Sequence, residues 1–77
     1  MISLYPNPVT SGMVSIESTT GDQIKAIEIL DLKGTLLKAL TPHQAKTEVE
    51  VSSFNSGMYF VRIRTEKSVV SKKIVIQ

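Results

Sequence analysis

The 77-residue chain has no cysteine, no tryptophan and a single histidine. Without cysteine it can form neither a disulfide nor a thiolate metal site. His43 has no second histidine or cysteine to join it as a ligand, which excludes the usual zinc ligand sets. No apolar run approaches the roughly 20 residues that a membrane-spanning helix needs, and no hydrophobic signal-peptide segment follows Met1. The length is that of one small domain.

The net charge of +2 is too small to indicate a nucleic-acid partner, but its distribution is uneven. From Arg62 to Gln77, five basic side chains stand against one acid, whereas acids outnumber bases in the preceding part of the chain. The C-terminal segment therefore forms a positive patch on a mildly acidic body. Edge protection is one explanation, because lysines on a terminal strand discourage pairing with other chains; recognition of a partner is the other.

The carboxylates form no catalytic pattern. Glu48 and Glu50 lie two residues apart on one face of an expected strand, and a glycosidase needs two carboxyls that flank a cleft. Asp22 and Asp31 adjoin turns, but calcium prefers six to eight oxygens and the chain has no dense Asp/Asn loop. Neither a phosphate-binding loop nor a G-x-S-x-G motif is present. We expect no enzymatic activity, no cofactor and no metal.

Isoleucine, valine and threonine make up 23 of the 77 residues, and such β-branched side chains suit the pleated surface of a sheet. Short apolar runs alternate with polar residues and are separated by turn residues, which is the pattern of an all-β sandwich. The sequence predicts a single domain over residues 1–77, a compact seven-stranded immunoglobulin-like β-sandwich. Its expected strands are Ile2–Tyr5, Met13–Ser18, Gln23–Leu30, Thr35–Ala39, Thr47–Val51, Gly57–Thr65 and Val69–Ile76.

The third strand is the one with competing interpretations. Ile27 and Ile29 alternate with Glu28, but Ile24 breaks the phase and predicts a bulge. Ile24, Ile27 and Leu30 also fit helical spacing; the neighbouring strands and the glycine at 34 argue against a long helix. In the sixth strand the core face is expected to hold Tyr59, whose hydroxyl would bond to backbone.

The segment LYPNPVTSG, Leu4 to Gly12, predicts a stiff entry into the second strand. Pro6 and Pro8 each lack an N–H and fix φ near −65°, so this stretch cannot lie inside a sheet ladder. Asp31-Leu32-Lys33-Gly34 reads as a hairpin turn in which Gly34 supplies a positive φ.

Four segments together resemble the type A C-terminal sorting domain of the type IX secretion system of Bacteroidetes: LYPNPVTSG, IEILDLKG, VSSFNSGMYFVRI and SKKIVIQ. The resemblance covers nearly the whole chain, and its specificity lies in the order, spacing and position of the motifs. One departure is Phe54, where leucine is commoner in the family. The matching residues, which we take as the candidate recognition signal, are Tyr5, Pro6, Asn7, Pro8, Asp31, Gly34, Gly57, Tyr59, Lys72 and Lys73.

The resemblance implies that the chain is a secretion signal at the C-terminal end of a larger cargo protein. Such cargo reaches the periplasm by its own signal peptide, and the type IX translocon and its shuttle components then recognise the sorting domain. A surface sortase usually removes the domain, upstream of the sandwich, and the cargo stays on the outer-membrane surface or is released outside the cell.

Two other interpretations keep the same fold. An immunoglobulin-like adhesion or carbohydrate-binding module would use the outward face of Phe60, Arg62 and Arg64 for its ligand. A spacer in a repeat protein is weakened by the single copy. A free edge on the terminal strand would also allow an edge-strand homodimer.

Overall fold

The computed structural model describes all residues from Met1 to Gln77. It is an all-β structure of seven strands, and it contains no helix long and apolar enough to cross a membrane. The fold class and the seven predicted strands are confirmed, with ends that differ by at most one residue. The strands are β1 Ile2–Tyr5, β2 Met13–Ser18, β3 Ile24–Leu30, β4 Leu36–Leu40, β5 Lys46–Glu50, β6 Gly57–Thr65 and β7 Val69–Ile76.

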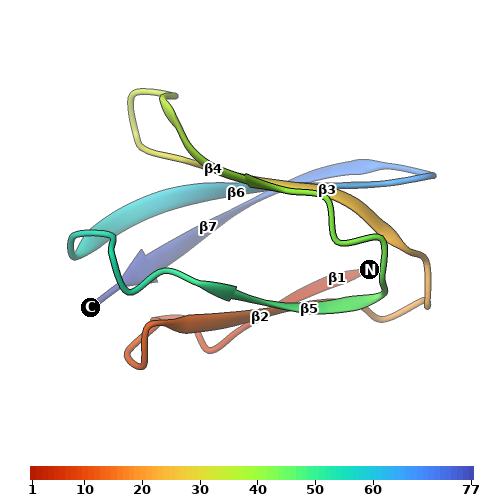
Figure 1. The fold of residues 1–77 in the computed structure, drawn as a ribbon, viewed down its shortest axis with the longest axis horizontal. Helices are drawn as coiled ribbons and strands as arrows, with labels where there is room; N and C mark the ends of the chain where they lie inside the picture. Colours follow the sequence, from red (N-terminus) through yellow and green to blue (C-terminus); the bar gives the residue numbers. More distant parts are fainter.

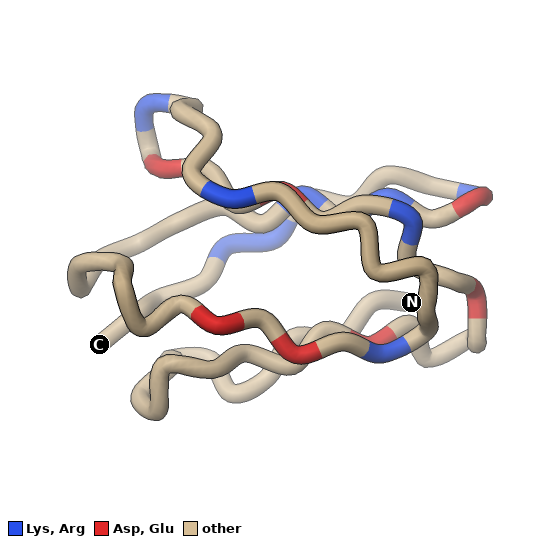
Figure 2. The backbone as a smooth tube through the Cα atoms, in the orientation of Figure 1, with Lys and Arg blue, Asp and Glu red and all other residues tan.

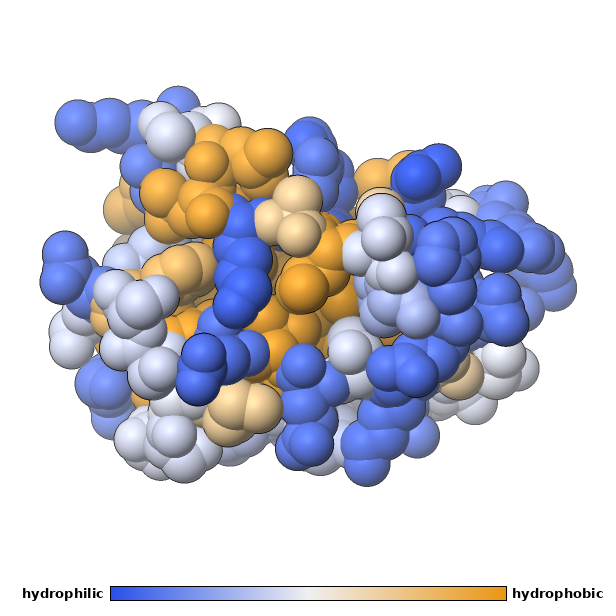
Figure 3. All heavy atoms as spheres, in the orientation of Figure 1, coloured by the Kyte–Doolittle hydropathy of each residue, from blue (hydrophilic) through white to orange (hydrophobic).

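The strands form two antiparallel sheets that pack face to face (Figure 1). One sheet has three strands in the order β1-β2-β5, and the other has four in the order β4-β3-β6-β7. Because β1 and β7 are the edge strands on one side, and β4 and β5 on the other, the sandwich has two open edges. Figure 3 faces the edge formed by β4 and β5, where hydrophobic side chains show over β4. Across this edge the Lys38 ammonium donates to the Glu50 carbonyl at 2.8 Å.

The core is built almost entirely from β-branched side chains on the inward face of each strand. Alternation along β6 buries every second residue from Tyr59 to Thr65, as the sequence predicts for a strand with one buried face. Phe54 lies at one end of the core and packs against it. The buried hydrophobic residues are Ile2, Val9, Val14, Ile16, Ile24, Ile27, Ile29, Val49, Val51, Tyr59, Val61, Ile63, Ile74 and Ile76.

The predicted irregularity of β3 is present. The register between β3 and β6 shifts between Ile24 and Ala26, so that both Ile24 and Ile27 reach the core although they are three residues apart. A second shift lies between Ile29 and Leu30, where β3 pairs with β4. The helical alternative for this segment is wrong, because β3 bonds to a strand on each side.

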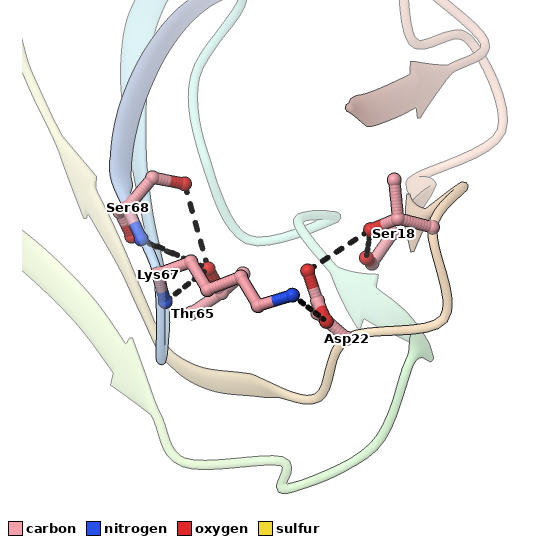
Figure 4. A network of polar contacts seen from close by, with 6 residues as sticks. Ser18, Asp22, Thr65, Lys67 and Ser68 are labelled. Atoms are coloured by element: carbon pink, nitrogen blue, oxygen red, sulfur yellow. Dashed lines mark hydrogen bonds and ion pairs between the residues drawn. The ribbon is translucent and has the colours of Figure 1, made fainter.

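A polar network joins the two sheets at the end of the sandwich that holds the β2–β3 and β6–β7 turns (Figure 4). The Thr65 hydroxyl accepts the N–H groups of Lys67 and Ser68, both at 3.2 Å, and fixes the β6–β7 turn. The Lys67 ammonium then lies 3.7 Å from the Asp22 carboxylate in the β2–β3 turn. The Thr20 hydroxyl donates to the same carboxylate at 3.0 Å, so Asp22 serves as a structural ion-pair partner.

Candidate functional site

Strand direction gathers most of the sequence motifs at one end of the sandwich. Strands β1, β3, β5 and β7 run toward this end, and β2, β4 and β6 start from it, because every paired neighbour is antiparallel. We call it the motif end; it lies at the left in Figure 1. The motif end comprises the β1–β2 loop (residues 6–12), the β3–β4 hairpin (31–35), the β5–β6 loop (51–56) and Gln77.

Asn7 ties the N-terminal motif to the C-terminal strand. Its side-chain amide donates to the carbonyl of Lys73 at 3.2 Å and accepts the N–H of Val75 at 3.1 Å, so it bonds the edge of β7 as a paired strand would. Val9 continues the pairing, donating to the Val75 carbonyl at 2.7 Å and accepting the N–H of Gln77 at 2.9 Å. The flanking prolines lie outside the ladder, as predicted, and the peptide bonds before Pro6 and Pro8 are both cis.

Tyr5 ends β1 with its ring partly exposed on the outer face of the three-stranded sheet. Its hydroxyl donates to a Glu17 carboxylate oxygen at 3.2 Å, and the Lys46 ammonium lies 5.9 Å from the ring centre. Interaction with Tyr5, and then the negative charge of Glu17, raises the pKa of Lys46 above its usual 10.5. The tyrosine therefore joins the outer faces of β1, β2 and β5.

Asp31 and Gly34 shape the β3–β4 hairpin. One carboxylate oxygen of Asp31 accepts the backbone N–H groups of Lys33 and Thr35, each at 2.9 Å, and the Asp31 carbonyl accepts the N–H of Gly34 at 3.0 Å. Gly34 has a φ of +87°, which a residue with a Cβ adopts only at a cost. These two motif residues hold the hairpin in shape, and the apolar side chain that the hairpin presents to solvent is Leu32, 59% exposed.

Gly57 and Tyr59 start β6 at the motif end. Gly57 has a φ of +153° and pairs with Ile76, which also forms a bridge to Val9. Tyr59 is buried; its hydroxyl donates to the carbonyl of Asn55 at 2.6 Å, and its ring lies 5.4 Å from that of Phe54. The predicted core position of Tyr59 and the bond from its hydroxyl to backbone are confirmed. The Gly-x-Tyr motif thus packs beneath the motif end and supports its surface.

Lys72 and Lys73 occupy the middle of β7, away from the motif end. Lys72 points toward the space between the sheets and is half-buried, whereas Lys73 faces outward, opposite Phe60. They belong to a four-stranded sheet whose strands carry six bases and one acid; the strands of the other sheet carry three acids and one base. Figure 2 shows this separation, with acids along β5 and bases in the opposite layer. The positive patch that the sequence predicted is therefore a property of a whole sheet.

The profile of the secretion system C-terminal sorting domain matches residues 3–77. The chain belongs to this family. Its role is therefore that of a sorting signal in type IX secretion, in a protein exported to the cell surface or beyond it, and the family is not a family of enzymes. No curated protein sequence matches the chain significantly.

Two solved structures share the fold of this sorting domain. One is PorZ, an essential bacterial surface component of the type IX secretion system of Porphyromonas gingivalis, with a TM-score of 0.74 and 19% identity over 99% of this chain. The sorting domain spans only 11% of the PorZ chain. The other is CopC from Methylosinus trichosporium OB3b, with a TM-score of 0.57 and 15% identity, covering 99% of this chain and 91% of CopC. At these identities the likeness establishes the fold alone.

The structure brings the Tyr-Pro-Asn-Pro segment against β7 but leaves the D-x-x-G hairpin on a different part of the same end. Val9 and Ser71 lie within the matching segments LYPNPVTSG and SKKIVIQ but were not among the candidate residues. Val9 is fully buried and bridges to Ile76, and the backbone of Ser71 is unpaired on the outer edge of β7. The only sequence signal for the first was an apolar residue directly after the prolines. The outward face of β6, which the sequence offered as a ligand-binding stripe of Phe60, Arg62 and Arg64, is not entirely free. The guanidinium of Arg62 forms an ion pair with the Glu28 carboxylate at 2.7 Å.

Proposed function

We propose that the motif end is the surface that the type IX export machinery recognises and binds. The observation that carries the proposal is the meeting, at one end of the sandwich, of loops whose family motifs lie far apart in the chain. Asn7, Asp31 and Gly57 each shape a different one of these loops. A surface that is already formed loses little conformational freedom when it docks, which favours recognition of the folded domain over recognition of a linear peptide.

In this proposal the sorting domain follows a cargo protein, and the translocon with its shuttle components binds the folded domain. The surface sortase then cuts upstream of β1. The core residues of the motifs, Tyr59 above all, act through the shape of the loops, whereas exposed side chains at the motif end touch the partner.

The experiment joins a signal peptide, a reporter protein and residues 1–77 in a Bacteroidetes host that secretes by the type IX route. Reporter on the surface of intact cells is measured by antibody labelling and by its accessibility to protease. We expect delivery with the domain and periplasmic retention without it. Equal delivery of the reporter lacking residues 1–77 contradicts the proposal.

A matched pair of variants tests whether the motif end itself is read. Leu32 at the motif end and Val69 at the opposite end are 59% and 61% exposed. Leu32→Glu and Val69→Glu therefore make the same chemical change at similar exposure, and neither side chain is in the core. We expect unchanged melting temperatures for both and reduced surface delivery for Leu32→Glu alone. Equal delivery of the two variants would place recognition elsewhere on the domain.

The adhesion or carbohydrate-binding alternative has a different outcome. It relies on the stripe of Phe60, Arg62 and Arg64, where Glu28 already engages one guanidinium. Strong glycan binding by the isolated domain on an array, together with surface delivery that does not need the domain, would support that alternative.

A further inference from the structure

The outer edge of β7 is only partly closed. The Lys73 carbonyl, both backbone groups of Val75 and the N–H of Gln77 are bonded by Asn7 and Val9. In an antiparallel strand, alternate residues point both backbone groups to the same side. Ser71 therefore faces the same edge as Lys73 and Val75. The backbone groups of Ser71 and the N–H of Lys73 form no hydrogen bond within the chain on that side.

The facing edge of β1 is open as well. The N–H of Thr19 donates to the carbonyl of Met1 at 2.8 Å, so Met1 and the residues in phase with it point toward β2. Ile2 and Leu4, in the opposite phase, direct their backbone groups away from the sheet. Between these two edges lies a groove of about 410 Å³. Its lining residues are Met1, Ile2, Ser3, Leu4, Asn7, Lys72 and Lys73.

The groove is basic. Lys72 and Lys73 both line it; Lys72 is half-buried and Lys73 is exposed. Neither ammonium forms an ion pair, and no aspartate or glutamate lines the groove. By contrast, the other cations of this sheet include Lys25 and Arg62, which are both held by carboxylates. The groove thus combines unpaired strand edges with unneutralised positive charge.

We propose that this groove binds an extended, acidic segment of a partner protein, which adds to β7 as a fifth strand of the larger sheet. The segment pairs with Ser71 and Lys73 through its backbone, and its carboxylates reach Lys72 on the inner face and Lys73 on the outer face. Asn7 sets one end of the added strand, because it already occupies the edge from the Lys73 carbonyl onward.

The positive charge of the groove favours an acidic segment over a second copy of the domain. Two β7 strands that paired through the same open stretch would bring their lysines close to one another, and like charges on facing strands oppose pairing. An acidic strand would instead place carboxylates beside these lysines, and opposite charges on facing strands favour pairing. The inference rests on the proposed function only for the identity of the partner protein that carries the segment, which would be a component of the export machinery.

The test uses the 77-residue domain and a blocked synthetic peptide that repeats the unit Thr-Thr-Glu-Glu, which places glutamates on both faces of an extended strand. Binding is followed by NMR through the backbone amide signals, at peptide concentrations up to the millimolar range. We expect the amides of Ser71 and Lys73 to shift most, with those of Ile2 and Leu4 next, while the amides of β4 and β5 stay unchanged. A peptide with lysine in place of glutamate should leave the spectrum unchanged.

Three variants sharpen the test. Ser71→Pro removes an outward N–H that no group of the domain uses, a position at which edge strands tolerate proline, and should abolish the shifts. Lys72→Gln, which keeps the length of the side chain close to that of lysine, should weaken binding about twofold to fivefold, as expected for a partly exposed ion pair. Lys33→Gln removes the same charge at the β3–β4 hairpin and should bind as the unchanged domain does.

Several results would overturn the inference. They are the absence of shifts at Ser71 and Lys73, equal binding of the lysine peptide, or undiminished binding by both Ser71→Pro and Lys72→Gln. Shifts at the same amides that grow with the concentration of the domain alone would instead assign the edge to a homodimer. Absence of peptide binding by the unchanged domain, with reporter export intact, refutes this inference alone, and peptide binding by a domain that has no role in export refutes the proposed function alone.

Discussion

Removal of the Asn7 side chain tests whether the N-terminal motif holds the C-terminal strand in place. Asn7→Ala breaks two hydrogen bonds, of 3.2 Å to the Lys73 carbonyl and 3.1 Å from the Val75 N–H. The prolines on either side remain, so the change isolates the amide. The main chain of Val9 still bonds to β7, and the variant should therefore fold.

The expected loss of stability follows from the exposure of these bonds. A hydrogen bond typically contributes about 0.5–1.5 kcal/mol to stability. Asn7 is exposed, and water replaces part of what is lost, so each bond belongs in the lower half of that range. The two together predict a decrease of about 1–2 kcal/mol in the free energy of unfolding. For a domain of this size, the melting temperature should fall by at least about 4 °C.

Urea unfolding, thermal melting by circular dichroism and amide hydrogen exchange measure the effect. The Val75 amide should exchange faster in Asn7→Ala, while that of Ile74, which faces β6, should not. Asn55→Ala is the control, because the Asn55 side chain is exposed and forms no hydrogen bond. An unchanged melting temperature together with unchanged exchange at Val75 would refute the reasoning, since the two bonds would then not exist in solution.

Three further predictions concern the other motif residues. Gly57→Val should destabilise the domain by more than about 1 kcal/mol, because the φ of +153° at this position strains a residue with a Cβ. A Cβ built there meets no neighbouring atom, so the loss would come from the backbone and not from a clash. An equal melting temperature for the two proteins would exclude this strain. Tyr59→Phe should cost about 1 kcal/mol by leaving the Asn55 carbonyl without its 2.6 Å bond, a loss that urea unfolding detects, and a neutral result would mean that water replaces the hydroxyl. Because the pKa of Lys46 is raised, its interaction with Tyr5 stabilises the fold below pH 10.5, and this stabilisation is lost as the pH rises through the folded-state pKa. The difference in melting temperature between the domain and Lys46→Met should therefore disappear well above pH 10.5. A difference that grows in that range would contradict the assignment.

Local features of the fold could be predicted because their causes are local. Strict alternation in β6 and β7 fixes which side chains face the core, and a hairpin of Asp31 and Gly34 needs only the conformational preferences of neighbouring residues. The bulge in β3 was predictable for the same reason, since Ile24 is out of phase with Ile27 and Ile29. The start of β3 and both ends of β4 and β5 differ from the prediction by one residue, because pairing partners decide where a ladder ends.

The candidate site was predictable as a set of residues but not as a surface. The motif resemblance named Asn7, Lys72 and Lys73 without any indication that Asn7 bonds directly to this strand. It also treated Asp31 and Tyr59 as signal residues, whereas the structure shows what each one holds in place. A family motif thus records which residues matter, and the contacts separate side chains that shape the surface from those exposed on it.

By itself, the sequence determined the strands, their inward faces, the tight turns and the family, because each of these depends on residue type and short-range spacing. Only the tertiary structure decided that Asn7 pairs with residues 66 and 68 positions away, that the motif loops share one end, and that a basic groove lies between β1 and β7. The reason is physical: these features depend on how the two sheets stack and on which strands lie at their edges, and the alternation within a single strand carries no information about either.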